Sequence, residues 1–206
     1  MQESEPALIL MNTRKWDQRF VNSDGDQIGS AVNYSDFDSN GTLSFFGTAG
    51  IVIPHMMQSD STDQSIANVT DDQVITFDTD VHHNGITRTS ASRFTITKAA
   101  SYLITFSGVT QGVINTYIAV WLKVNGNNVA NSNTLYQYKS NNATTVVAVS
   151  FIEHFAVNDY FEFWTWGDNT GNKWDATAAV AENPGVTPAR PACPSIIITC
   201  NYLGKD

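Results

Sequence analysis

A two-residue alternation of apolar and polar side chains constrains this chain more than any other feature. In residues 94–106 apolar side chains recur at every second position with few exceptions, and they are Phe94, Ile96, Ala100, Tyr102, Ile104 and Phe106. Because successive residues of a β-strand point to opposite faces, the pattern predicts one strand, or two joined at Lys98 to Ser101. The alternation returns in residues 118–124, and the Asn125-Gly126 pair that follows is typical of a two-residue hairpin turn.

Further strands are predicted where β-branched and aromatic residues concentrate, in residues 145–155, 160–166 and 195–203. No segment of ten residues shows the periodicity of an amphipathic helix. Strands separated by Gly, Asn and Asp clusters predict an all-β fold, an antiparallel jelly-roll sandwich of about 8–10 strands. With 206 residues, of which 42% are hydrophobic, the chain can fill the core of such a domain.

The sequence predicts a boundary between residues 64 and 65. Residues 65–206 are assigned to the jelly roll, and residues 1–64 to an extended N-terminal anchoring arm with a few short strands. The arm has apolar residues whose spacing suits neither a helix nor a long strand, so we expect them to bury against another surface. They are Trp16, Phe20, Phe45, Phe46, Ile51 and Ile53. A second unusual segment, residues 168–194, holds four of the six prolines and predicts an extended excursion.

The charge of the chain argues against two classes of partner. The formal net charge is −9, and the 11 Lys and Arg residues are never clustered. Without a basic stripe to neutralise phosphates, binding to nucleic acid or to an anionic membrane is not expected. No apolar run approaches the roughly 18 residues of a membrane-spanning helix, and the start of the chain carries Glu3 and Glu5 instead of a basic region. We therefore expect synthesis in the cytoplasm without a signal peptide, and no membrane insertion.

The two cysteines are expected to remain free thiols. Cys193 and Cys200 flank a strand-like run, residues 195–199, which would hold their Cα atoms on the order of 23 Å apart at about 3.3 Å per residue. A disulfide requires Cα atoms within about 7 Å of each other. This arrangement points to folding in a reducing compartment.

A metal site is considered at two places. Asp36, Asp38, Asn40 and Gly41 imitate the first half of a calcium-binding loop. The bidentate Glu is missing, because Gly47 stands at its place, so an ordinary Asx-rich turn is favoured. Calcium is therefore the only cofactor whose binding the sequence leaves open.

His82 and His83, which follow Asp78 and Asp80, form the second possible metal site. Adjacent strand residues point to opposite faces, so only one of the two histidines could join both carboxylates, and a solvated strand end is favoured.

The densest group of aromatic residues lies near the strand predicted at residues 160–166. Tyr160, Trp164 and Trp166 share one face of that strand, and Phe161 and Phe163 share the other. We expect the Phe face in the core and the other face at a subunit interface, together with Tyr202. The alternative is a carbohydrate platform, formed by these aromatic side chains and Trp174, on which sugar rings would stack.

Catalytic signatures are absent from the sequence. There is no Gly-Xaa-Ser-Xaa-Gly elbow, no phosphate-binding Gly-Lys-Ser/Thr loop and no His-Glu-Xaa-Xaa-His zinc motif. We therefore do not expect an enzyme. Two carboxylates distant in sequence could still meet in a cleft, so a glycan-processing enzyme is kept as the least favoured class.

The order of several segments resembles a known family. Phe94-Thr-Ile-Thr, Tyr102-Leu-Ile-Thr-Phe-Ser-Gly and Trp121-Leu-Lys-Val-Asn-Gly follow one another as in the globular head of the first complement component and the related tumour-necrosis-factor-like jelly rolls. Residues 155–163 and 194–199 resemble later strands of that family, so the resemblance covers residues 72 to 203. Ala100 and Asn158 stand where the family usually has Gly, and the 168–194 excursion is unusual for it.

The resemblance implies a ten-strand jelly roll that forms tight homotrimers and presents its outer loops to ligands. Similar modules occur in virion proteins of tailed bacteriophages. For an acidic chain without a collagenous stalk, the resemblance to these virion modules favours a trimeric capsid decoration protein. Such a protein would be a cement or head-fibre protein on the virion surface, and its N-terminal arm would contact the major capsid protein or neighbouring subunits. The alternatives are a tail-borne head that binds a receptor or host surface glycan, and a soluble complement-type ligand-binding module.

Overall fold

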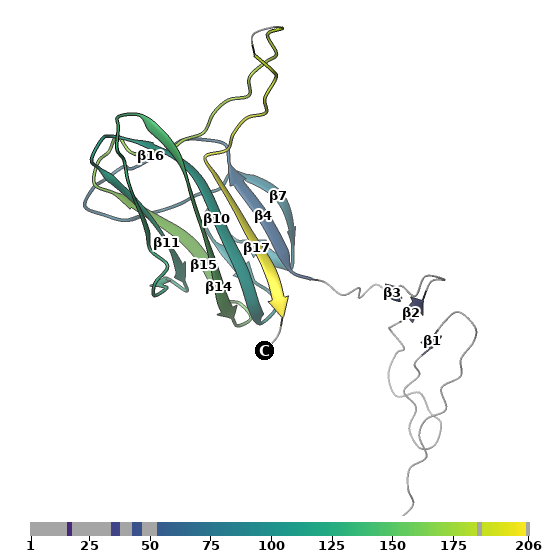
Figure 1. The fold of residues 1–206 in the computed structure, drawn as a ribbon. Coiled ribbons are helices and arrows are strands. Elements are labelled where there is room, and N and C mark those ends of the chain that lie inside the picture. The colour runs from purple at the N-terminus through teal and green to yellow at the C-terminus, as the bar shows by residue number, and fades with distance from the viewer. Residues whose placement is uncertain (1–15, 18–33, 38–42, 47–52, 185–186, 205–206) are drawn as a thin grey trace, which may run out of the picture. The chain divides into compact units, whose positions relative to one another are not determined.

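The structure is a computed structural model that describes residues 53–184 and 187–204 in full, and the backbone of residues 16–17, 34–37 and 43–46 (Figure 1). The chain forms two compact units, Met1–Val52 and Ile53–Asp206. In the N-terminal unit, β1 (Trp16–Asp17), β2 (Tyr34–Phe37) and β3 (Leu43–Phe46) form an antiparallel sheet in the order β1-β2-β3.

The C-terminal unit is a sandwich of two antiparallel sheets. The long strands of sheet 1 are, in spatial order, β14 (Ala143–Phe155), β10 (Ala100–Gly112), β17 (Ile196–Gly204), β4 (His55–Asp60) and β7 (Thr79–Asn84). The short strands β16 (Lys173–Trp174) and β5 (Gln64–Ser65) extend sheet 1 beside β10.

Sheet 2 faces sheet 1 across the core. Its main strands are, in spatial order, β8 (Ile86–Arg88), β9 (Phe94–Ile96), β15 (Tyr160–Gly167) and β11 (Tyr117–Val124). Three short strands complete it: β12 (Asn127–Asn128) and β13 (Thr134–Gln137) beside β11, and β6 (Gln73–Val74) beside β15. From β9 onward the long strands alternate between the sheets, because β10, β14 and β17 lie in sheet 1, and β11 and β15 in sheet 2. This connectivity is that of a jelly roll, which confirms the predicted fold.

The alternation in the sequence places the core as predicted. Residues 94–96 form β9 and residues 100–106 begin β10, so two strands are joined near Lys98. The six apolar residues that defined the pattern are all fully buried: Phe94, Ile96, Ala100, Tyr102, Ile104 and Phe106. Of the intervening residues, Thr95, Ser101 and Thr105 are half-buried and Thr97 is exposed, so they face away from the core.

Turn residues have the backbone geometry that their types allow. Asn125 and Gly126 have φ values of 50° and 80°, so the predicted hairpin turn joins β11 to β12. Asn158, at a position where the resembling family usually has Gly, has a φ of 71°. Asparagine tolerates this left-handed conformation better than most residues, so the turn is kept without glycine.

The boundary predicted after residue 64 lies too late in the chain. The C-terminal unit starts at Ile53, because β4 pairs with β17 on one side and with β7 on the other. Met56, Gln58 and Asp60 of β4 are almost completely buried. Residues 53–64 therefore belong to the jelly roll, and only residues 1–52 remain outside it.

Cys193 and Cys200 are both free, as predicted. Cys193 is exposed, whereas Cys200 is fully buried in β17, and burial raises the pKa of the Cys200 thiol. The thiolate is the reactive form, so the two cysteines should differ strongly in reactivity.

In the folded protein we expect one thiol to react quickly with a chromogenic disulfide reagent and the second only when the protein unfolds. Measuring the time course at pH 8 with and without denaturant tests this, and Cys193→Ser should remove the fast phase alone. Two fast phases in the native protein, or a missing thiol in the unfolded one, would contradict the assignment.

Candidate functional site

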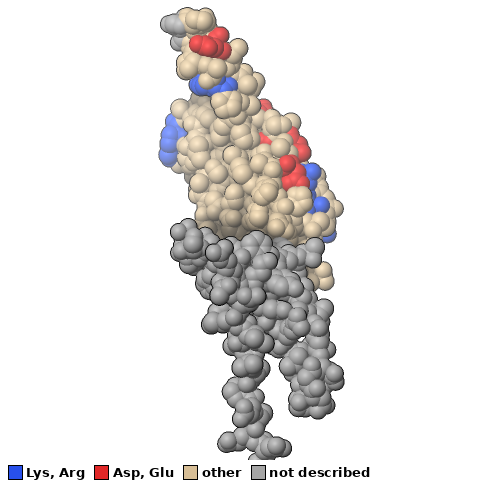
Figure 2. Space-filling view, turned by 90° about the vertical axis from the view of Figure 1, so that its right-hand side faces the viewer, with Lys and Arg blue, Asp and Glu red and all other residues tan. Residues whose placement is uncertain are grey.

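The outer face of the long strands of sheet 1 lacks charged side chains, and Lys173 of the short strand β16 lies beside it, paired with Asp63 and Asp175. On the fully described strands β14, β10, β17 and β4, no Lys, Arg, Asp or Glu occupies an outward-facing position. Several apolar side chains are exposed there instead, including Ile152 (67%), Val146 (62%) and Leu203 (52%). Seen from the side of β7 and β4, charged side chains lie at the margins of the described surface, and uncharged ones cover its middle (Figure 2). Uncharged faces with exposed aliphatic residues are typical of contact surfaces.

Histidines lie at the β4–β7 side of this face, where the sequence suggested a metal site. The rings of His55 and His82 stack with centroids 4.8 Å apart, while His83 Nδ1 lies 2.8 Å from Asp80 Oδ2. Asp78 instead accepts hydrogen bonds from the backbone and hydroxyl of Ser61. The two histidines thus have different neighbours, as the strand alternation predicted. Within residues 53–184 and 187–204, no three His, Cys, Asp or Glu residues are grouped to hold a metal ion.

The aromatic strand β15 buries one face and presents the other outward, as predicted. Phe161 and Phe163 are fully buried, and Tyr160, Trp164 and Trp166 are half-buried on the outer face of sheet 2. Trp174 does not join them, because it is fully buried in the core.

Side chains and backbone of the same chain already cover this outer aromatic surface. The Arg93 guanidinium lies 3.8 Å from the centroid of the Tyr160 ring, and Lys123 Nζ lies 3.6 Å from that of Trp164. The indole nitrogen of Trp166 donates to the Val69 carbonyl at 2.8 Å.

The four residues predicted for the subunit interface therefore do not form one surface. Tyr202 lies on β17 of the opposite sheet, where its ring packs edge-to-face on Tyr102 at 5.8 Å. Tyr160, Trp164 and Trp166 have partners within the chain. Sequence periodicity identified the correct face of β15, but the residues that cover it come from segments distant in sequence.

A hairpin projects from one end of the sandwich, formed by residues 177–193 (Figure 1). The two sides of the hairpin are joined by backbone pairs at every third residue: Thr177 with Cys193, Val180 with Arg190, and Asn183 with Thr187. Each pair forms two hydrogen bonds of 2.8 to 3.0 Å. The proline-rich excursion predicted from the sequence is thus an extended, paired segment.

The spacing of the hairpin's prolines explains its ladder. Pro184, Pro188, Pro191 and Pro194 each directly follow a paired residue. Proline has no N–H to donate, and it restricts the residue before it to extended backbone. The only half-buried side chains between residues 177 and 193 that the structure describes are Val180 and Thr187, so the hairpin does not pack on the sandwich.

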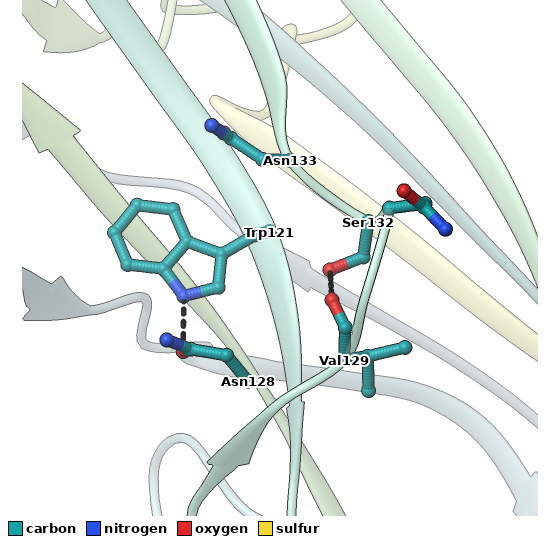
Figure 3. A pocket seen from close by; sticks show the side chains of 6 residues that line it. Trp121, Asn128, Val129, Ser132 and Asn133 are labelled. Atoms are coloured by element: carbon teal, nitrogen blue, oxygen red, sulfur yellow. Dashed lines mark hydrogen bonds between the residues drawn. The ribbon is translucent and has the colours of Figure 1, made fainter.

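A small pocket lies beside Trp121 at the β12–β13 edge of sheet 2 (Figure 3). Its volume is about 230 Å³, and its lining residues are Trp121, Asn128, Val129, Asn131, Ser132 and Asn133. In this view, the amides of Asn128 and Asn133 lie on either side of the indole ring. None of the lining side chains carries a charge.

The loop that forms this pocket is held against β11. The Val129 N–H donates to the Leu122 carbonyl at 3.0 Å. The Ser132 hydroxyl accepts from the Leu122 N–H at 3.1 Å and donates to the Val129 carbonyl at 2.8 Å. Sequence reasoning missed this pocket, although the run of asparagines that follows Trp121 was a local signal of it.

Several predicted site residues lie outside the part of the chain that can be tested. Asp38 and Asn40 of the suggested calcium loop are not among the described residues, and Asp36 is described only as backbone of β2. The side chains of the predicted anchoring residues are likewise outside the described set, except that of Ile53, which is 56% exposed. Within the described residues, no helix has the length and hydropathy needed to cross a membrane.

No family model matches the chain, and no curated protein matches its sequence. Solved structures resemble the sandwich. The match to the crystal structure of murine APRIL at pH 5.0 covers 73% of this chain and 99% of the APRIL chain, at 10% identity and a TM-score of 0.48. The match to the globular domain of the zebrafish complement 1qA protein covers 75% of this chain and 98% of that domain's chain, at 11% identity and a TM-score of 0.45. These belong to the tumour-necrosis-factor and complement-head classes named by the sequence resemblance. At such identities the likeness concerns the arrangement of strands and says nothing of ligands.

Proposed function

We propose that this protein is a non-enzymatic structural module that assembles as a homotrimer through the outer face of sheet 1. The observation that carries the proposal is the absence of charge on the outward-facing positions of β14, β10, β17 and β4, together with exposed Val146 and Ile152 on β14. Burying aliphatic surface of this kind stabilises an interface by roughly 25 cal/mol per Å².

The net charge of the chain supports self-association at this face above any other. Each copy carries a formal charge of −9, so identical copies repel one another wherever acidic surfaces meet. A contact between copies is least opposed where neither partner presents a charge. The number of copies, three, follows from the family resemblance seen in the sequence.

The setting that we propose is the surface of a virus particle, where the trimer acts as a bacteriophage capsid decoration protein. The N-terminal residues 1–52 form a unit separate from the sandwich, as expected of a segment that contacts the major capsid protein. The chain enters β4 beside the end of β17, since His55 pairs with Asn201. The start of β4 and the end of β17 thus lie at the same end of the sandwich.

A receptor-binding head is the second candidate function, and the hairpin of residues 177–193 favours it. The hairpin begins and ends beside the start of β17 (Figure 1), whereas β4 begins beside the end of β17, where His55 pairs with Asn201. Within the sandwich, the length of β4, about 20 Å for six residues, separates the base of the hairpin from residue 55, where β4 begins. An exposed hairpin at the end opposite the attachment point is well placed to contact a receptor.

Light scattering on the purified protein tests the trimer. At micromolar concentration we expect three times the chain mass of 22.6 kDa. Ile152→Lys should reduce the mass to that of the monomer, because three copies would bring ammonium groups into an apolar contact. The side chain is 67% exposed in the single chain, so the substitution should leave the fold intact.

Leu135→Lys serves as the matched control. Leu135 is 56% exposed on β13 of sheet 2, so the same change there should leave the trimer unaffected. A wild-type monomer would refute self-association. A trimer that survives Ile152→Lys and is lost with Leu135→Lys would place the interface on sheet 2 instead.

A further inference from the structure

We propose that the pocket beside Trp121 binds one ring of a neutral carbohydrate. The pocket combines an indole ring with the side-chain amides of Asn128, Asn131 and Asn133. An indole face packs on the C–H face of a sugar ring, and amides pair with its hydroxyl groups. The pocket lies on sheet 2, so this proposal and that of self-association through sheet 1 can fail separately.

The polar groups of the pocket suit hydroxyl groups because each amide can both donate and accept. Asn128 Oδ1 accepts from the Trp121 indole N–H at 2.9 Å, which leaves the Asn128 amide NH₂ able to donate (Figure 3). Among the described residues, the side-chain amides of Asn131 and Asn133 have no hydrogen-bond partner. A sugar hydroxyl is likewise both donor and acceptor, so it can pair with either atom of such an amide.

The charges around the pocket favour a neutral ligand. Lys123 lies near Trp121, with its Nζ 6.0 Å from the centroid of that ring. The same Nζ pairs with Asp72 Oδ2 at 2.8 Å and lies over the ring of Trp164. It is therefore already neutralised, and the lining offers neither a cation nor a carboxylate to an ionic ligand.

The pocket is preorganised, so little conformational entropy is lost on binding. Ser132 is almost completely buried, and its hydroxyl fixes the loop to Leu122. The hydrogen bond to Asn128 sets the orientation of the Trp121 ring. Asn131 has a φ of 61°, a conformation that asparagine tolerates and that turns the chain around the pocket. Groups already held in place bind more tightly than groups that must first be ordered.

The size of the pocket limits the ligand to a single ring. Pockets that enclose drug-sized ligands measure about 300–1,000 Å³. This one measures about 230 Å³ and opens at the surface. It therefore accommodates a terminal or side-branch sugar of a longer glycan and not a chain of several rings.

Saturation-transfer NMR on the full chain tests this proposal, with methyl glycosides of glucose, galactose, mannose and N-acetylglucosamine as probes. Sialic acid and glucosamine provide an anionic and a cationic comparison. We expect saturable transfer to at least one neutral glycoside. Trp121→Ala should weaken binding about tenfold or more, and Trp121→Phe should restore part of it because an aromatic face remains.

Asn133→Ala provides a variant that cannot act through unfolding, because Asn133 is exposed. It should weaken binding severalfold, while Asn127→Ala, at an exposed asparagine of β12 that does not line the pocket, should change nothing. Failure of all four neutral glycosides to bind would overturn the proposal. So would preferential binding of a charged sugar, or binding that persists unchanged in both Trp121→Ala and Asn133→Ala.

Discussion

A chain that starts at Ile53 is expected to fold as the whole protein does, whereas a chain that starts at Ser61 is expected to remain unfolded. The two differ only in β4 and the two residues before it. β4 lies inside sheet 1, paired with β17 on one side and β7 on the other. Its loss would remove both ladders and leave β7 without a neighbour in sheet 1.

The residues of β4 explain the size of this effect. The buried Gln58 amide donates to Asp80 Oδ1 at 2.6 Å, and the Asp60 carbonyl accepts from the Ser195 N–H at 2.9 Å. Met56 adds a fully buried side chain, which alone contributes about 2–5 kcal/mol. Together, the two lost strand ladders, these hydrogen bonds and the Met56 side chain contribute a free energy comparable to the whole net stability of a domain, about 5–15 kcal/mol.

Circular dichroism and thermal melting of the two truncated chains measure this difference. A cooperative transition in residues 53–206 and none in residues 61–206 is the expected result. If residues 61–206 melt cooperatively near the wild-type temperature, β4 is dispensable.

The chain of residues 53–206 also tests the proposed anchoring, because it should form trimers that no longer attach to the parent particle. Full occupancy on capsids would instead favour the receptor-binding function.

Replacing Trp174 by Ala is expected to destabilise the sandwich by about 3–5 kcal/mol. The Trp174 side chain is fully buried, and its ring packs edge-to-face on Phe106 at 5.2 Å. Its indole N–H donates to Thr165 Oγ1 at 3.2 Å. Gly108 makes room for the ring, because a Cβ at that position would lie 2.6 Å from it. The substitution would therefore leave a large cavity that rigid strands cannot close.

Chemical denaturation of Trp174→Ala measures this loss, and Trp166→Ala is its matched control. Trp166 is half-buried, and its indole makes one hydrogen bond, to Val69, so its loss should cost about 1 kcal/mol. Equal destabilisation by the two substitutions would contradict the different environments of the two indoles. A larger effect at Trp166 would mean that the outer face of sheet 2 is buried in an assembly.

The period of the apolar residues made most of the strands predictable. In β9, the first half of β10 and β15, the apolar inward-facing side chains were identified from their positions alone, because a strand turns every second residue to the same face. The hairpin turn at Asn125 and Gly126 was equally local, since these residue types tolerate positive φ. The fold class followed from such local rules.

Strand β4 was not predicted because several of its buried residues are polar. Its buried residues include Gln58, whose amide donates to Asp80, and Asp60, whose carboxylate accepts from Thr62 and whose backbone carbonyl accepts from Ser195. A buried polar group is tolerated when it is hydrogen-bonded, but Asp80 and Ser195, which bind the Gln58 amide and the Asp60 carbonyl, are 22 and 135 residues away. A local pattern therefore assigned these residues to the arm.

The sequence by itself determined which apolar residues of the alternating strands face inward, where the hairpin at Asn125 turns and that both thiols stay free. The tertiary structure alone decided what covers each face. Arg93 and Lys123 cover the aromatic residues of sheet 2, whereas the outer face of sheet 1 exposes aliphatic side chains without charge. The physical reason is that alternation is a property of one strand, while coverage depends on which distant segments pack against it.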